Sequence, residues 1–255
     1  MEKVKSLITI CAVGIIVFAI LPEVSAQEKE WSVTFETPVN SKYIWRGVNL
    51  VDDFVFQPSV SISRGGFSFS AWGSMEMTDI NDYSGEYGNA SMEFTEIDYT
   101  VDYSFSTDFI NCSLGLINYQ FPNTPFDSTT EVYGSLGIST VLEPTITIYQ
   151  DIDQADGTYL NFSIAHSFAK TGSDVTVDVG SWISAGSSKH NLFYYMNNNW
   201  ALADAGFSVS VPFPINEKTK IVTSINFSTF FDSDIRSRME NPDNVWFGTG
   251  FVYSY

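Results

Sequence analysis

Apolar and polar residues alternate with a period of two along most of the chain. From Phe67 to Thr78 the odd positions hold apolar residues or glycine, whereas the even positions are mostly polar. Successive side chains of a β-strand point to opposite faces, so this period predicts strands with one apolar and one polar face. The alternation recurs at residues 96–105, 205–213 and 221–232. The sequence therefore predicts an all-β protein.

The polar rows contain carboxylates, which decides between two kinds of β protein. Glu96, Asp98 and Asp102 share one face of their segment. A soluble β-sandwich would bury such a face, and burial of unpaired carboxylates costs too much free energy. A transmembrane barrel instead places the apolar row against lipid and the polar row around water. We therefore predict a transmembrane antiparallel up-and-down β-barrel.

The links between these segments are alternately tight and long, as expected for short periplasmic turns and long external loops. About twelve strands are predicted, at residues 31–47, 54–63, 67–78, 93–105, 109–121, 131–140, 145–153, 158–169, 175–185, 201–214, 220–232 and 245–255. The even number returns both termini to the periplasm. Residues 189–200 fit a loop or a strand, so ten or fourteen strands are the alternatives.

The N-terminal residues have the pattern of a signal peptide. Lys3 and Lys5 precede an apolar run at residues 7–21 and a small-residue site that ends at Ala26. The run is shorter than the ~20 residues that a membrane-spanning helix needs. We expect cleavage after Ala26, which leaves residues 27–255 as an outer-membrane barrel. Cys112 is then the only cysteine, so no intrachain disulfide is expected.

Aromatic residues dominate the last predicted strand, where Phe247, Phe251, Tyr253 and Tyr255 share one row. A terminal aromatic residue of this kind resembles the signal by which the barrel-assembly machinery recognises its substrates. The expected partners are this machinery, outer-membrane lipid and lipopolysaccharide. Nucleic acid is not expected as a partner, because a net charge of −18 repels polyanions.

The inward rows carry more acidic than basic residues, which predicts a lumen for cations or neutral polar solutes. Charged rings set the selectivity of pores, so we expect an electrostatic constriction. Its predicted residues are Lys42, Arg46, Glu96, Asp98, Asp102, Tyr149 and Asp151. The alternative interpretation is a structural network of salt bridges that plugs a narrow barrel. Both small residues and large ones such as Trp182 and Trp246 lie on the inward rows, and the sequence does not show whether the large ones meet at one level.

Several segments resemble the TorF-type family of outer-membrane porins. They are residues 41–47 (SKYIWRG), 96–99 (EIDY), 130–134 (TEVYG), 149–153 with 157–159, and the aromatic C-terminus. They occur in the expected order over nearly the whole mature chain. The resemblance implies a barrel and a porin, but neither a particular substrate nor catalytic residues.

We therefore predict a channel for passive diffusion of small polar solutes, biased toward cations, with no cofactor. The alternatives are a structural or adhesive barrel with a plugged lumen and an outer-membrane lipid hydrolase. A hydrolase needs a nucleophile and its base within hydrogen-bond reach. The two histidines, His166 and His190, lie on a lipid-facing row and in a predicted loop, so no enzyme is expected. No segment has the spacing of an EF-hand, so no metal site is predicted.

Overall fold

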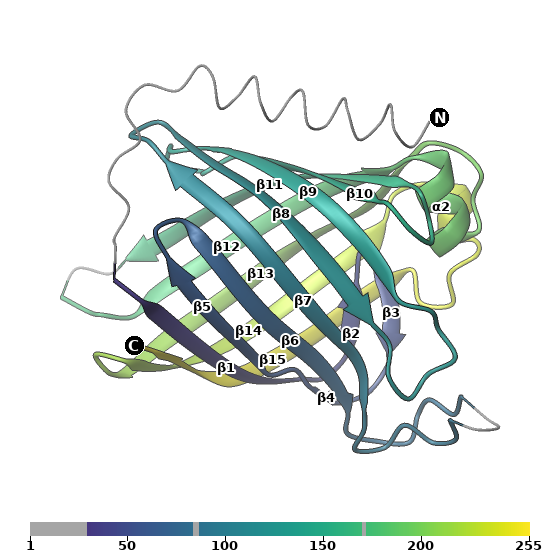
Figure 1. Ribbon diagram of the computed structural model, residues 1–255, viewed down its shortest axis with the longest axis horizontal. Helices are drawn as coiled ribbons and strands as arrows, with labels where there is room; N and C mark the ends of the chain where they lie inside the picture. Colours follow the sequence, from purple (N-terminus) through teal and green to yellow (C-terminus); the bar gives the residue numbers. More distant parts are fainter. Residues whose placement is uncertain (1–29, 84–86, 170–171) are drawn as a thin grey trace.

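The computed structural model describes residues 30–83, 87–169 and 172–255. The chain forms an antiparallel sheet that closes into a barrel, because the first wall strand pairs with the last (Figure 1). Tight turns and both ends of the described chain lie at one end of the barrel, and the longer links lie at the other (Figure 1). The predicted signal peptide and its cleavage site lie outside the described residues.

The wall strands follow one another in sequence order around the barrel. They are β1 (Ser32–Asn40), β4 (Val55–Phe56) with β5 (Ser59–Arg64), β6 (Phe67–Glu76), β7 (Phe94–Ser106), β8 (Ile110–Gln120), β9 (Thr129–Ile138), β10 (Thr145–Asp151), β11 (Thr158–Ala169), β12 (Thr176–Gly186), β13 (Ala201–Asn216), β14 (Thr219–Phe230) and β15 (Asp243–Ser254). Because β4 and β5 share one position, the described residues form a closed barrel of 12 strands. The predicted fold is confirmed.

Pro58 separates β4 from β5 without breaking the wall. Proline has no backbone N–H to donate to a neighbouring strand. The Gln57 N–H donates to the Pro38 carbonyl, and the Gly73 N–H donates to the Pro58 carbonyl. These bonds keep β4 and β5 aligned between β1 and β6.

The prediction that the first strand continues to residue 47 is wrong. β1 ends at Asn40, and the chain then forms a separate hairpin of β2 (Tyr43–Trp45) and β3 (Val48–Val51). Arg46 and Gly47 make its two-residue turn with φ values of 47° and 83°. Positive φ at both positions is typical of the type I′ turn, whose twist matches an antiparallel hairpin. The alternation hides this break, because the hairpin is itself extended.

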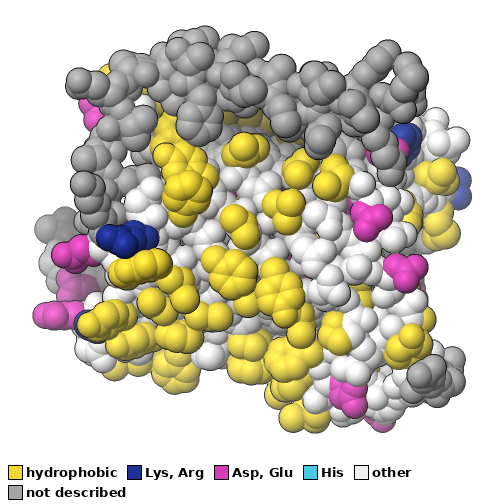
Figure 2. Space-filling view, in the orientation of Figure 1, with side chains coloured by type: hydrophobic (Ala, Val, Ile, Leu, Met, Phe, Trp, Pro, Cys, Tyr) yellow, Lys and Arg dark blue, Asp and Glu magenta, His cyan; other side chains and the backbone are white. Residues whose placement is uncertain are grey.

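The two faces of the wall differ as predicted. Val101 and Phe247, which belong to the outward rows, are 52% and 56% exposed. Ser74, Glu76 and Asp204, which belong to the inward rows, are buried. Figure 2 shows hydrophobic side chains spread over the outer face of the strands, with acidic side chains mainly toward the barrel ends.

Two of the long links contain short helices, α2 (Ser188–Tyr195) and α3 (Ser233–Arg236). The Ser187 hydroxyl accepts the His190 N–H at the start of α2, and the Asp232 carboxylate accepts the Asp234 and Ile235 N–H groups at the start of α3. Residues 189–200, which fitted a loop or a strand, thus begin in a helix.

Within the described ranges, no helix has both the length and the apolar composition needed to cross a membrane.

Adjacent residues in the middle of β7 provide a test of the barrel's orientation in lipid. Val101 faces outward and Thr100 faces inward. We expect Val101→Arg to lower the free energy of unfolding by about 2–4 kcal/mol, because it places a charge in hydrocarbon. The matched Thr100→Arg variant should have a smaller effect, because its side chain enters a polar lumen that contains acids. Urea titration of protein folded into lipid vesicles measures both, and equal losses would contradict the assigned faces.

Candidate functional site

The β2–β3 hairpin reaches across the inside of the barrel. It follows β1, yet the Arg46 guanidinium donates two hydrogen bonds to Glu131 of β9, with Nη1–Oε1 and Nη2–Oε2 distances of 2.9 and 2.7 Å. In the closed order of strands β9 lies nearly opposite β1. The hairpin therefore narrows the lumen at the end that carries the long links.

Aromatic rings surround the Arg46 guanidinium. Its central carbon lies 4.5 Å from the ring centroid of Trp45, 4.8 Å from that of Tyr149 and 4.2 Å from that of Tyr159. Only 8% of the Arg46 side chain and 1% of the Glu131 side chain are exposed. A buried charge requires a partner, and Arg46 has both a bidentate carboxylate and cation–π contacts.

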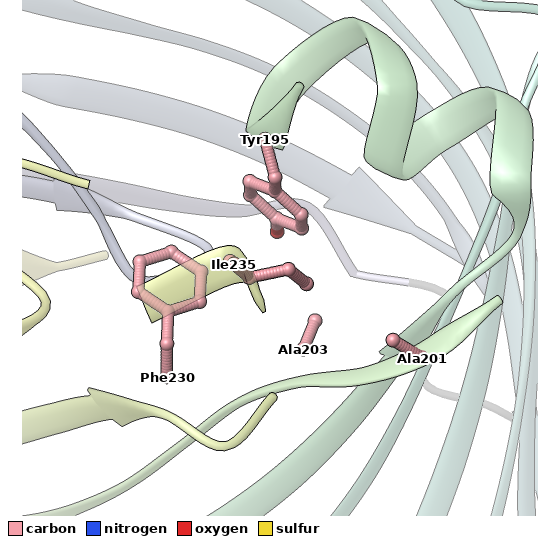
Figure 3. Close-up of a cluster of buried hydrophobic side chains, with 5 residues drawn as sticks. All are labelled: Tyr195, Ala201, Ala203, Phe230 and Ile235. Carbon is pink, nitrogen blue, oxygen red and sulfur yellow. The ribbon is translucent and has the colours of Figure 1, made fainter. Parts of the chain in front are cut away.

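The hairpin turn rests on a hydrophobic cluster at the long-link end. The cluster comprises Tyr195, Ala201, Ala203, Phe230 and Ile235, which come from α2, β13, β14 and α3 (Figure 3). The Tyr195 hydroxyl donates to the Arg46 carbonyl over 3.0 Å. A Cβ added at Gly47 would lie 2.8 Å from the Phe230 ring, so this close approach, as well as the positive φ, requires glycine.

Two of the predicted constriction residues lie together, because the Tyr149 ring contacts the Arg46 guanidinium. Glu96 lies nearby and accepts a hydrogen bond from Tyr43 of the hairpin. Asp98 is on the same inward row as Glu96, and its Oδ1 atom is buried without a hydrogen-bond partner among the described residues.

Three predicted residues lie apart from this centre. Lys42 forms an ion pair with Asp52 within the hairpin link, so it does not face the inward carboxylates of the wall. Asp102 accepts a hydrogen bond of 2.7 Å from the Tyr133 hydroxyl. Asp151 accepts hydrogen bonds from the Thr129 hydroxyl and the Asp153 N–H, so it organises the link after β10.

Glu131 is a residue of the site that sequence reasoning missed. Its position two residues before Tyr133 places it on the inward row of β9, so the alternation contained this signal. Glu131 also accepts a hydrogen bond of 2.9 Å from the Tyr119 hydroxyl. Nothing in the local sequence pairs it with Arg46, which lies 85 residues earlier.

Asp204 is the second acid that the predicted site omitted, although it lies on an inward row. Its carboxylate accepts hydrogen bonds from the Tyr159 hydroxyl at 2.8 Å and from the Trp182 indole N–H at 2.9 Å. The Ser184 hydroxyl is a third donor. These donors stabilise a buried carboxylate that has no cationic partner in direct contact among the described residues.

Cavities lie within the lumen that the described residues enclose. One of about 510 Å³ lies against the hairpin, and its wall includes Arg46, Asp204 and several aromatic rings. The second, of about 340 Å³, is lined by Glu36, Asp178, Lys220 and many small residues. The first cavity stays open partly because the Trp182 ring packs closely against Gly206 on the barrel wall. A Cβ added at Gly206 would lie 2.2 Å from that ring.

The two histidines occupy different surroundings. His166 Nδ1 lies 2.8 Å from the Val141 carbonyl oxygen. His190 Nε2 lies 3.3 Å from Arg46 Nη1, and burial together with the Arg46 charge lowers the pKa of His190 to about 3. Neither imidazole of the described chain bonds to a serine hydroxyl, so the geometry provides no serine–histidine pair for hydrolysis.

Comparisons with known proteins identify the type of barrel. The sequence matches no protein-family model and no curated protein. The structure is similar to the KdgM porin, with a TM-score of 0.52 and 10% identity over 88% of this chain and 99% of that one. A NanC porin (TM-score 0.49, 11% identity, 87% and 98% covered) and an outer-membrane channel from Pseudomonas putida F1 (0.49, 8%, 92% and 97%) are similar less closely. The likeness to the KdgM porin shows that the chain has the fold of an outer-membrane porin.

The Arg46–Glu131 pair provides a test of what holds the hairpin in place. Glu131→Gln leaves the buried guanidinium without its counter-charge, so we expect a loss of about 3–5 kcal/mol in the free energy of unfolding. Asp52→Asn removes the more exposed ion pair with Lys42 and should cost no more than about 1 kcal/mol. Urea titration in vesicles measures the loss, and limited proteolysis should show earlier cleavage of the hairpin in Glu131→Gln. Equal stability of the two variants would refute the structural role of the pair.

His190 predicts a pH dependence of stability. The unfolded chain binds a proton at His190 near pH 6.5, whereas the folded protein resists protonation until about pH 3. The contribution of neutral His190 to stability is therefore complete above pH 6.5 and is lost as the pH falls toward 3. Replacement by glutamine should remove about 1.4 kcal/mol per pH unit from the slope of unfolding free energy between pH 6 and 4. An unchanged slope would contradict a neutral, buried His190.

Proposed function

We propose that this protein is an outer-membrane channel for passive diffusion of small polar solutes, biased toward cations. The observation that carries the proposal is a closed porin-type barrel whose lumen is narrowed by the β2–β3 hairpin but keeps cavities of about 510 and 340 Å³. Barrels of about eight strands are filled by side chains, whereas those of sixteen to eighteen leave an open channel. A barrel of 12 strands lies between these limits, so its interior contents set what passes.

The charge of the lumen supports the cation bias. Glu36 and Asp178 line the second cavity with a single basic residue, Lys220. Asp102 adds negative charge on the inward row of β7, while Arg46 is neutralised by Glu131. A narrow passage with an excess of fixed carboxylates concentrates cations and repels anions.

The finer parts of the sequence prediction belong to the same proposal. They are cleavage after Ala26, assembly through the aromatic residues of β15, contact with lipopolysaccharide, and membership of the TorF-type porins. The outward positions of Phe247 and Phe251 on β15 are compatible with recognition by the assembly machinery.

A structural barrel with a plugged lumen is the second candidate function. The observation that favours it is the firm attachment of the hairpin, whose turn is held by Glu131 and by the Tyr195 hydroxyl. Conduction separates the two candidates. A lipid hydrolase receives no support from the surroundings of His166 or His190.

Single-channel recording in a planar bilayer tests the proposal. In a KCl gradient the reversal potential should show preference for K⁺ over Cl⁻. The preference should fall toward unity in Asp98→Asn/Asp102→Asn and in Glu36→Gln/Asp178→Asn, because each double variant removes fixed negative charge from the lumen.

Asp234→Asn is the matched control, because it removes an acidic charge from α3 in a loop rather than from the wall. Its selectivity should equal that of the wild type. Silence of the wild type at all voltages would support the plugged barrel, and anion preference would refute the cation bias.

A further inference from the structure

The cavity beside the hairpin has a lining rich in aromatic rings. They belong to Trp45 of the hairpin and to wall residues of β8, β10, β11, β12 and β15. The wall residues are Tyr119, Tyr149, Tyr159, Trp182 and Trp246. Rings of this kind offer flat apolar faces, and tyrosine and tryptophan add a polar edge. A lining of rings around a water-filled passage suits a solute that is apolar on its faces and polar at its edges.

Hydrogen-bonding groups between the rings are available to a solute. Asn161 and Ser163 line the cavity next to Tyr159 on the inward row of β11. Neither side chain, nor the Trp246 indole N–H, bonds to another group in the part of the chain that the structure describes. An amide and a hydroxyl can each donate and accept, so they match hydroxyl groups in either role.

The charged groups in the lining already have partners within the protein. Arg46 forms its bidentate pair with Glu131, and Asp204 accepts hydrogen bonds from Tyr159, Trp182 and Ser184. An anion would gain no free cationic partner here. An organic cation would meet the Arg46 guanidinium, which already contacts the rings of Trp45, Tyr149 and Tyr159. The lining therefore favours an uncharged solute.

We propose that this cavity is a binding site for a neutral saccharide of one or two sugar rings, an inference that rests on the proposed channel function. The C–H face of a sugar ring packs on the aromatic faces, and its hydroxyl groups bond to Asn161, Ser163 and the Trp246 indole N–H. The volume of about 510 Å³ lies within the range of small-molecule sites, ~300–1,000 Å³. Such a site slows a sugar in transit and gives the channel a preference among neutral solutes.

Isothermal titration calorimetry with maltose, on the full barrel in a detergent without a sugar headgroup, measures binding directly. We expect saturable binding that weakens about tenfold in Trp246→Ala. This variant removes one aromatic ring from the lining, and the Trp246 ring makes no hydrogen bond or ring contact with another described side chain. Asn161→Ala should weaken binding by a similar factor without removal of a ring. Trp200→Ala is the matched control, because this tryptophan is 66% exposed and does not line the cavity. It should bind maltose as the wild type does.

The same titration with choline chloride tests the rival ligand class. Binding of choline without binding of maltose would overturn the proposal, and so would the absence of both. Equal weakening in Trp200→Ala would also overturn it, since the site would then not be this cavity. Because the titration needs no ion current, a barrel that is silent in a bilayer but binds maltose refutes the channel function alone. A conducting barrel that does not bind maltose refutes only the saccharide site.

Discussion

The whole structure depends on closure of the sheet. A bilayer offers no water to pair with backbone N–H and C=O groups, so a sheet that crosses it cannot have a free edge. The pairing of β1 with β15, from Thr34 with Ser254 to Asn40 with Gly248, removes that edge. Once the sheet is closed, every wall strand has one face toward lipid and one toward the lumen. The alternation of side chains along the chain follows from this geometry.

The lumen differs from the lipid-facing surface, because it holds polar and charged groups. Where these groups are buried, they need hydrogen-bond or ion-pair partners. Arg46 meets Glu131 and three aromatic rings, and Asp204 meets three donors from wall strands. These contacts attach an element that does not belong to the wall, the β2–β3 hairpin. The shape of the lumen is consequently set by a few side chains that have many partners, whereas the barrel itself is formed by pairing of the wall strands.

The wall could be predicted from the sequence and most of the interior could not. Each lipid-facing residue, such as Val101 or Phe247, satisfies a local rule that depends only on its position in a strand. The site depends on which strands face each other across the lumen, which local patterns do not contain. Arg46 was found because a base among inward acids is conspicuous, but Glu131 was missed because its role appears only when β9 lies opposite the hairpin. Lys42 and Asp151 were assigned to the constriction on their row alone, whereas each is engaged by its own link.

The docking position of the hairpin has a consequence for the order in which parts of the chain fold. The hairpin leaves the ribosome just after the first wall strand, but its turn rests against residues that come much later, among them Tyr195, Phe230 and Asn244. Contacts between residues so distant in sequence require closure of long loops, whose entropic cost must be met before they form. The hairpin therefore takes its place only when the last strands are present. The docked position of this early segment is thus a sign that the late segments have already folded.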